Sequence, residues 1–310
     1  MELIRVKTNP ILKPISSHFW EAKAVFNPAV IYLEGKIHLI YRAMSKDNVS
    51  SFGYARFKKD GITLEKRLRD PIFSPQEPFE TRLRNHHNTG CEDPRITLIG
   101  NKIYMCYVAV DGKPKVALTS IKKEDFLKEK WNWEKPIVIS KPRIMDKNAC
   151  VIKLKNRFAF FHRLENKIWI DVRENLNFFH GQWIEGKPVL FPRKGKWDSK
   201  RVGIAGPPIK TKYGWLLIYH GADDKNVYRL GAALLDLRNP LKVLSRSNSW
   251  ILEPEENYEK RGQVPNVIFS CGTALVFNKL FLYYGAADKV IGLAVGNFKI
   301  LLEKLKKKEL

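Results

Sequence analysis

The chain has 310 residues, of which 44% are hydrophobic and 12% aromatic, enough apolar material for a sizeable folded core. Its 55 lysines and arginines outnumber its 32 aspartates and glutamates, for a formal net charge of +23. No apolar run approaches the roughly 18 residues that span a bilayer, and the N-terminus lacks the apolar core of a secretion signal. We therefore predict a cytoplasmic globular protein that does not enter a membrane.

Neither the cysteines nor the basic residues form a binding motif. The four cysteines are scattered without a CxxC pair, which argues against a disulfide framework or a zinc site. The lysines and arginines are dispersed, apart from the tail "KLKKKE" at 304–309, and no zinc finger or RNA-binding signature is present. We predict no specific nucleic-acid partner, and a closing helix with a cationic last turn at the C-terminus.

One sequence unit recurs five times. Each copy has a short apolar strand, a turn with Gly or Asn, an aromatic-rich strand and a third apolar strand. The copies occupy 27–57, 92–121, 146–173, 206–237 and 264–298. Their spacing, roughly 55 to 65 residues, suits four-stranded propeller blades whose outer strands come from the intervening stretches. A pair of β-sandwiches is the alternative, and repetition of the unit favours the propeller.

The predicted fold is therefore all-β: a five-bladed β-propeller with short N- and C-terminal extensions. It forms a single domain over 1–310, with blades near 27–66, 92–133, 146–190, 204–250 and 264–300. In a propeller, the first strand of each blade lines the central channel, so residues at its start face a shared funnel.

Aligning the copies predicts which side chains meet in that funnel. The blade entrances are Asn27, Asp93, Lys147 with Asn148, Pro207 and Asn266. The ends of the second strands are Tyr41-Arg42, Tyr107-Val108, Phe161-His162 followed by Arg163, Tyr219-His220 and Tyr283-Tyr284, with Asp224 and Asp288 four residues beyond the last two pairs. Such a ring of aromatic, cationic and carboxylate groups is typical of an oligosaccharide site.

The segment "EDPR" at 92–95 is the sharpest local signal. Charged residues ahead of an apolar run are ordinarily a solvated turn. The repeat alignment offers another interpretation, because it places Asp93 at a blade entrance, where the side chain faces the funnel.

A family resemblance rests on eight segments in order: "AVFNPAV", "EDPRI", "DKNA", "GIAGPPI", "WLLIYHG", "YRLGAALLDL", "PEENYEKRGQVPNVIF" and "YYGAAD". Together they resemble glycoside hydrolase family 130, the β-mannoside phosphorylases and related mannosidases. The resemblance runs from about Asn9 to Phe298. It implies a five-bladed propeller, which agrees with the repeat count.

The resemblance also implies a chemistry. An inverting glycosidase needs a carboxylic acid and a carboxylate base, whereas a phosphorylase needs only the acid because phosphate is already an anionic nucleophile. Asp93 matches the family's proton donor, which acts through the mannosyl 3-hydroxyl. The candidate phosphate ligands are Lys115, Lys147, Arg163 and His220, with Lys115 standing where an arginine is expected.

Further residues are candidates for the sugar. Glu92 is expected to be structural and Arg95 to orient a carboxylate. The predicted substrate-binding residues are Asn27, Arg42, Arg95, Asp223, Asp224 and Asp288, and a turn-forming role is the alternative for each Asp and Asn among them. The adjacent His86 and His87 have no third ligand at metal spacing, so we assign them to a loop at the acceptor site. No metal or cofactor is expected, and inorganic phosphate is the co-substrate.

The sequence thus predicts a β-mannoside phosphorylase, which converts a β-mannoside oligosaccharide and phosphate into α-mannose 1-phosphate. A β-mannoside hydrolase is the first alternative, with Asp224 or Asp288 as its second carboxylate. A non-catalytic basic propeller that binds a partner is the second, and an Asp93 buried away from any cleft would favour it. The linkage, the acceptor sugar and homo-oligomer formation are left open.

Overall fold

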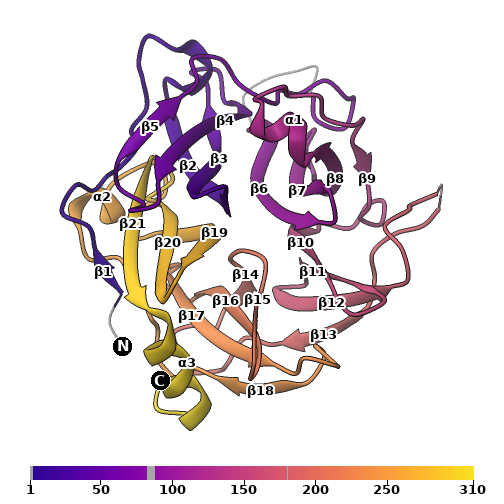
Figure 1. The fold of residues 1–310 in the computed structure, drawn as a ribbon, viewed down its shortest axis with the longest axis vertical. Coiled ribbons are helices and arrows are strands. Elements are labelled where there is room, and N and C mark those ends of the chain that lie inside the picture. Colours follow the sequence, from indigo (N-terminus) through magenta and orange to yellow (C-terminus); the bar gives the residue numbers. More distant parts are fainter. Residues whose placement is uncertain (1–2, 82–87, 180) are drawn as a thin grey trace.

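The computed structural model describes residues 3–81, 88–179 and 181–310, which form a ring of antiparallel blades around a central axis (Figure 1). Blade 1 contains β2 (Ala24–Leu33), β3 (Lys36–Met44), β4 (Val49–Lys58) and β5 (Leu64–Arg67). Blade 2 contains β6 (Thr89–Ile99), β7 (Lys102–Val110), β8 (Pro114–Lys122) and β9 (Ile137–Val138). A short parallel contact between β4 and β6 joins these two blades into one sheet.

The remaining blades repeat this plan. Blade 3 contains β10 (Lys147–Lys153), β11 (Phe158–Leu164), β12 (Lys167–Arg173) and β13 (Lys187–Leu190). In blade 4 the inner strand is split into β14 (Arg201–Ile204) and β15 (Ile209–Thr211), which both pair with β16 (Gly214–Ala222), followed by β17 (Tyr228–Leu235) and β18 (Val243–Arg246). Blade 5 contains β19 (Ile268–Val276), β20 (Lys279–Ala286) and β21 (Val290–Asn297).

The N-terminus closes the ring. Strand β1 (Ile4–Arg5) pairs antiparallel with β21, so the first residues of the chain supply the outer strand of blade 5. Figure 1 shows the two termini on the same side of the ring. The predicted five-bladed propeller is confirmed.

Helices are short and peripheral: η1 (Phe19–Glu21), α1 (Lys123–Leu127), α2 (Asn257–Lys260) and α3 (Phe298–Lys307). The predicted C-terminal helix is α3, which buries Leu301, Leu302 and Leu305 and carries lysines in its last turn. None of the helices in the described part of the chain has the length and apolar character that a membrane crossing requires.

Five apolar clusters fill the spaces between neighbouring blades. Phe52 and Tyr54 of blade 1, for example, pack with Met105 and Tyr107 of blade 2. Equivalent clusters lie between blades 2 and 3, 3 and 4, 4 and 5, and 5 and 1. Each blade buries both of its faces in this way, which explains why its inner and second strands read as nearly continuous apolar runs.

A polar contact also recurs in every blade. Near the end of each second strand, an aromatic side chain contacts a buried carboxylate that precedes that blade's inner strand. These five buried carboxylate contacts are Tyr41 with Glu21, Tyr107 with Glu80, His162 with Asp146, Tyr219 with Asp198, and Tyr284 with Glu259. Because a buried carboxylate is costly without partners, each contact fixes the chain segment that leads into a blade.

Candidate active site

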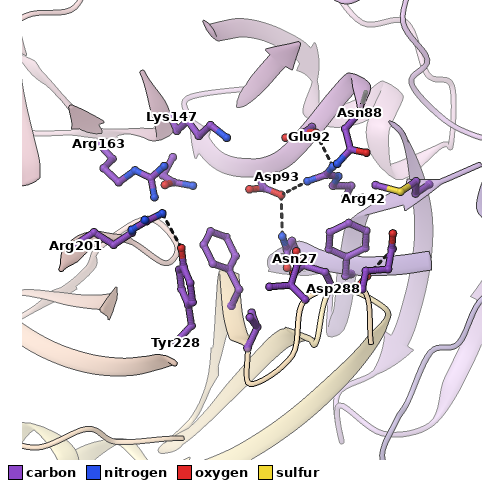
Figure 2. A pocket seen from close by; sticks show the side chains of 17 residues that line it. Asn27, Arg42, Asn88, Glu92, Asp93, Lys147, Arg163, Arg201, Tyr228 and Asp288 are labelled. Atoms are coloured by element: carbon purple, nitrogen blue, oxygen red, sulfur yellow. Dashed lines mark hydrogen bonds and ion pairs between the residues drawn. The ribbon is translucent and has the colours of Figure 1, made fainter. Parts of the chain in front are cut away.

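A pocket of about 400 Å³ lies where the inner strands meet at one mouth of the ring (Figure 2). Six of the predicted site residues line it: Asn27, Arg42, Asp93, Lys147, Arg163 and Asp288. They come from β2, β3, β6, β10, β11 and the turn after β20. The structure therefore brings together residues that are up to 261 positions apart in the sequence.

The inner strands aim these side chains through repeated β-bulges. The register of β2 shifts between Phe26 and Ala29, that of β6 between Glu92 and Arg95, and that of β10 between Lys147 and Cys150. The residue inside each bulge has a left-handed backbone: φ is 48° at Asn27, 50° at Asp93 and 53° at Asn148. Asn and Asp tolerate this conformation better than other residues with a side chain, which explains their presence there.

Asp93 lies at the centre of the pocket. Its Oδ1 accepts hydrogen bonds from Asn27 Nδ2 at 2.8 Å and from Arg42 Nη1 at 3.3 Å. Burial by itself would raise the pKa of Asp93, but the positive charges of Arg42 and Arg95 outweigh it and lower the pKa below its usual value. In this state of the pocket, Asp93 is a carboxylate at neutral pH.

Arg42 connects the two acids of the "EDPR" segment. Its Nη2 donates to Glu92 Oε1 at 2.5 Å, its Nε donates to Ser50 Oγ at 3.1 Å, and its guanidinium carbon lies 4.6 Å from the centre of the Phe26 ring. Glu92 therefore neutralises and orients the cation that contacts Asp93, the structural role expected for it. With three fixed partners, Arg42 presents Asp93 with a defined donor.

Asp288 is the second carboxyl group of the pocket whose protonation is perturbed. Burial raises its pKa to about 7, with Arg42 opposing the rise and the negative charge of Asp93 adding to it. The two aspartates thus differ in protonation: near neutral pH, Asp93 is ionised and Asp288 is partly protonated. Figure 2 shows them on the same side of the pocket as Arg42 and Asn27.

The opposite wall of the pocket is cationic. Lys147, Arg163 and Arg201 converge there, as Figure 2 shows, and Arg201 donates to the Tyr228 hydroxyl at 3.0 Å. Within the described residues, none of these three cations has a carboxylate at ion-pair distance. Burial lowers the pKa values of Lys147 and Arg163, and the positive charge of neighbouring cations adds to this effect. Such a wall favours an anionic ligand.

Arg201 and Tyr228 were missing from the residues predicted from sequence. The repeat alignment placed the entrance of blade 4 at Pro207, whereas the structure begins its inner strand at Arg201. The sequence feature that could have identified Arg201 is the short stretch "RVGI" ahead of "AGPPI". It is the first half of a strand that two prolines interrupt. The remaining lining residues that were not predicted as ligands are Phe26, Met44, Asn88, Glu92, Asn148, Gln263, Val264, Val267 and Phe269.

Two predicted phosphate ligands are not in the pocket. Lys115, at the start of β8, forms an ion pair with Asp111 across the β7–β8 hairpin and lines a separate surface hollow. His220 is fully buried behind the cationic wall. Its ring packs on Phe269 at 4.4 Å between centroids and so closely on Gly203 that a Cβ there would lie 2.4 Å from Nε2. Burial and the nearby arginines lower the pKa of His220, so its ring is neutral.

Arg95 is a structural residue and does not line the pocket. Its guanidinium is buried and donates to three backbone carbonyls, those of Asp93 at 3.0 Å, Ile204 at 3.1 Å and Ala205 at 2.7 Å. Arg95 was predicted to orient a carboxylate and to bind sugar, but its guanidinium contacts backbone carbonyls and does not reach the pocket. It holds the backbone of the Asp93 bulge against blade 4.

Asp223 and Asp224 also lie outside the pocket, in the loop between β16 and β17. Asp223 accepts from Arg229 Nη1 at 2.8 Å and from the backbone N–H groups of Lys225 and Val227, which is the turn-forming alternative. Asp224 is exposed, and its carboxylate lies 3.4 Å from Ser199 Oγ. Asn266, aligned as the entrance of blade 5, is likewise exposed, and its carbonyl accepts from the Tyr228 amide.

The predicted acceptor-site histidines His86 and His87 lie outside the described residues. Within 3–81, 88–179 and 181–310, no cluster of three or more His, Cys, Asp or Glu side chains could hold a metal ion.

Known proteins are similar to this one along almost the whole chain. A 1,2-beta-oligomannan phosphorylase of Thermoanaerobacter sp. (strain X514) is 41% identical over 311 residues, covering 96% of this chain and 98% of that protein. A beta-1,2-mannobiose phosphorylase of the same strain is 42% identical over 310 residues, covering 94% and 96%.

Solved structures agree. Beta-1,2-mannobiose phosphorylase from Listeria innocua, in complex with beta-1,2-mannobiose, superposes with a TM-score of 0.82 at 26% identity and covers 99% of this chain and 100% of that one. The profile of glycoside hydrolase family 130, described as beta-1,4-mannooligosaccharide phosphorylase, matches residues 3–307. The chain therefore belongs to glycoside hydrolase family 130.

Proposed function

We propose that this protein is a β-mannoside phosphorylase that acts on β-1,2-linked manno-oligosaccharides and inorganic phosphate, releasing α-mannose 1-phosphate. The observation that carries the proposal is the pocket itself, in which one central aspartate faces a wall of three cations without carboxylate partners among the described residues. The β-1,2 linkage is supported by the names of the two relatives at 41% and 42% identity.

The pocket divides the chemistry between its two sides. Phosphate, bound by Lys147, Arg163, Arg201 and the Tyr228 hydroxyl, attacks the anomeric carbon of the mannosyl unit. Asp93 supplies the proton to the departing oxygen, through the mannosyl 3-hydroxyl as the family resemblance implies. Because the nucleophile enters opposite the leaving group, a β-mannoside gives an α-phosphate. The proposal needs no metal or cofactor.

The protonation state of Asp93 matters to this mechanism. Phosphorolysis begins with a protonated acid, yet the pKa of Asp93 is lowered by Arg42 and Arg95 despite its burial. The reverse reaction needs the same group as a base, by microscopic reversibility. The ground state seen here is therefore the one suited to synthesis, and phosphorolysis requires that Asp93 acquire a proton as the substrates bind.

A β-mannoside hydrolase is the alternative, since one solved relative is described with the statement that the family contains glycoside hydrolases that target beta-1,2 mannosidic linkages. Such an enzyme needs a second carboxylate to activate water. Of the two carboxylates predicted for that role, Asp224 does not line the pocket and Asp288 does. The three cations opposite Asp93 favour phosphate over water as the nucleophile. The non-catalytic alternative required Asp93 to lie away from a cleft, whereas Asp93 lines the pocket.

Phosphate dependence tests the proposal directly. The purified protein is incubated with β-1,2-mannobiose, with and without inorganic phosphate, and mannose 1-phosphate and free mannose are both quantified. We expect one mannose 1-phosphate for each mannose released, and no turnover without phosphate. β-1,4-Mannobiose serves as the matched control for the linkage. Release of two mannoses in the absence of phosphate would establish the hydrolase instead.

A further inference from the structure

Blade 3 departs from the other blades at one position of the repeated carboxylate contact. Four blades use a tyrosine there: Tyr41, Tyr107, Tyr219 and Tyr284. Blade 3 uses His162, whose Nδ1 lies 2.7 Å from Asp146 Oδ2. A tyrosine hydroxyl keeps its proton throughout the physiological pH range, whereas an imidazole changes its charge within that range. Blade 3 alone among these five contacts is therefore built on a group that titrates near neutral pH.

The geometry around His162 calls for a doubly protonated ring. Its Nε2 lies 2.9 Å from the backbone oxygen of Glu185, so both ring nitrogens face oxygen acceptors. A neutral imidazole can donate from only one nitrogen and would leave a lone pair facing an oxygen. Burial opposes the charge, but the contacts with Asp146 and Glu185 outweigh it and raise the pKa of His162 above its usual value.

Asp146 depends on His162 more than the other four carboxylates depend on their aromatic partners. Glu21, Asp198 and Glu259 also bind arginines, and Glu80 also accepts from backbone N–H groups. Asp146 is 3% exposed, and within the described residues its only ion-pair partner is His162, while its Oδ1 has no hydrogen-bond partner. After loss of one imidazole proton, the neutral ring can donate to only one of its two oxygen acceptors, Asp146 Oδ2 or the Glu185 carbonyl, and Asp146 loses its cationic partner, so the contact weakens or rearranges.

The contact is joined directly to the cationic wall. Asp146 immediately precedes Lys147, and His162 immediately precedes Arg163. Lys147 and Arg163 are paired with each other across β10 and β11. The contact therefore lies one residue before each of two pocket cations, with His162 on β11 and Asp146 directly ahead of β10, so a rearrangement of either partner acts on the cation next to it in the chain.

We propose that the His162–Asp146 contact is a protonation-dependent positioning device, which holds Lys147 and Arg163 in the arrangement that binds phosphate while the imidazole is doubly protonated. This proposed role of the His162–Asp146 contact rests on the phosphorylase function proposed above. His162 is a positioning residue in this proposal, because it acts through Arg163 and through Asp146 on Lys147.

Other charged groups around the contact are accounted for. The charged side chain facing it from β12 is Asp171, which pairs with Arg173 at 3.7 Å. Glu185, ahead of β13, contacts the ring through its backbone oxygen, and its exposed side chain pairs with Lys141 at 3.5 Å. The sign of the pH effect follows from the raised pKa. The positioning contact is fully formed at low pH and is lost as the pH rises through the pKa of His162 in the folded protein.

Phosphate binding to the protein without mannoside tests the proposal independently of turnover. Calorimetric titrations of wild type and His162→Tyr, which installs the residue of the other blades, are made with inorganic phosphate between about pH 6 and about pH 9. We expect the variant to bind roughly tenfold more weakly than wild type at the acidic end, with the ratio approaching one at the alkaline end. The ionisation of phosphate itself is the same in both titrations and cancels in this ratio.

Two further variants provide a second test and a control. His162→Gln replaces the ring with a neutral donor of smaller size and should give the same convergence if His162→Tyr folds poorly. His38→Gln is the matched control, because His38 is another buried histidine, in blade 1, with a pKa lowered to about 4 by burial, and is neutral over the whole range. Its phosphate affinity should follow that of wild type at every pH.

The outcomes separate this proposal from the proposed function. A ratio of affinities that is the same at all pH values would overturn the positioning device and leave the phosphorylase assignment intact. A wild-type protein that binds no phosphate at any pH would overturn both. Nuclear magnetic resonance of the imidazole, assigned by its loss in His162→Gln, should show a pKa above the usual histidine value; a ring that stays neutral down to about pH 6 would also refute the proposal.

Discussion

At the scale of single residues, the carboxyl group of Asp93 is the most exacting element of the proposed mechanism. Asp93→Asn preserves the shape and the acceptor oxygen for Asn27 and suits the left-handed backbone at φ 50°, but it has no transferable proton. We expect phosphorolysis and synthesis both to fall by about 10²- to 10⁴-fold, with the melting temperature little changed. Initial rates in both directions, beside a thermal denaturation curve, provide the measurement.

Asp224→Asn is the natural control for this change, because Asp224 is exposed and outside the pocket. Its rates should match those of wild type. Near wild-type turnover in Asp93→Asn would remove Asp93 from the role of acid.

Asp288 makes a second prediction, about stability. Its pKa is raised by burial to about 7 from the ordinary 3.8, so the folded protein keeps this proton at pH values where the unfolded chain has lost it. The folded state therefore loses stability as the pH rises from about 4 to about 7, and the full penalty remains above that window. Asp288→Asn removes the penalty and suits the positive φ of 51°.

We expect Asp288→Asn to be more stable than wild type by on the order of 1–3 kcal/mol at about pH 8, with a smaller difference at about pH 5. Urea unfolding at both pH values measures this. Equal stabilisation at the two values would mean that the gain does not come from the ionisation of Asp288.

At the scale of secondary-structure elements, the inner-strand bulge places the chemistry. Repetition of the strand unit was enough to predict the blades and the convergence of Asn27, Asp93 and Lys147, because alternating apolar strands and Gly or Asn turns are local properties of the sequence. The register within a blade was less predictable. In blade 3 Lys147 pairs with Arg163, and in blade 5 Phe269 pairs with Gly285. In these two blades the residue that contacts the buried carboxylate is therefore the second of two adjacent aromatic residues, His162 and Tyr284.

Those one-residue shifts have a physical origin. A bulge adds a residue to one strand without changing the pattern of apolar letters around it, so adjacent aromatic pairs such as Phe161-His162 and Tyr283-Tyr284 cannot be aligned from sequence alone. The carboxylate partners resolve the ambiguity, since only one member of each pair contacts a buried acid.

The bulge of blade 3 predicts a difference between two substitutions at Asn148. Asn148 is 1% exposed and has φ 53°. Asn148→Ala and Asn148→Gly both delete the side chain, but only alanine is strained by the left-handed backbone. We expect Asn148→Ala to be less stable than Asn148→Gly by about 1 kcal/mol, measured by urea unfolding. If alanine were the more stable of the two, the bulge would not hold this residue in the left-handed region.

At the scale of the whole molecule, the sequence was most informative about architecture and least informative about the cationic wall. Five similar units must close on one another, and the resulting ring makes all entrances converge. Lys115 was wrongly predicted to bind phosphate, because its ammonium group forms an ion pair with Asp111, four residues earlier in the same hairpin. Arg201 was missed because two prolines divide the strand that carries it. Alignment of the repeated units shows neither the ion pair of Lys115 nor the division of the strand that carries Arg201.

Ring closure gives the last prediction. Strand β1 is only two residues long, so its attachment depends on Arg5, whose Nε and Nη2 donate to the two carboxylate oxygens of Glu259 at 2.8 and 2.9 Å. The side chain of Glu259 is 0% exposed. Arg5→Ala leaves this carboxylate without its cation and frees the strand that closes blade 5. We expect a loss of about 3 kcal/mol in the free energy of unfolding.

Two comparisons isolate the cause. Lys36→Ala removes one partner of an exposed ion pair with Glu65 and should cost less than about 1 kcal/mol. Adding Glu259→Gln to Arg5→Ala removes the uncompensated charge, and the double variant should recover part of the loss. Because α2, which contains Glu259, leads directly to the pocket residues Gln263 and Val264, Arg5→Ala should also weaken binding at the active site, although Arg5 does not line that pocket. If Arg5→Ala proved no more destabilising than Lys36→Ala, the N-terminal strand would not be what holds the ring closed.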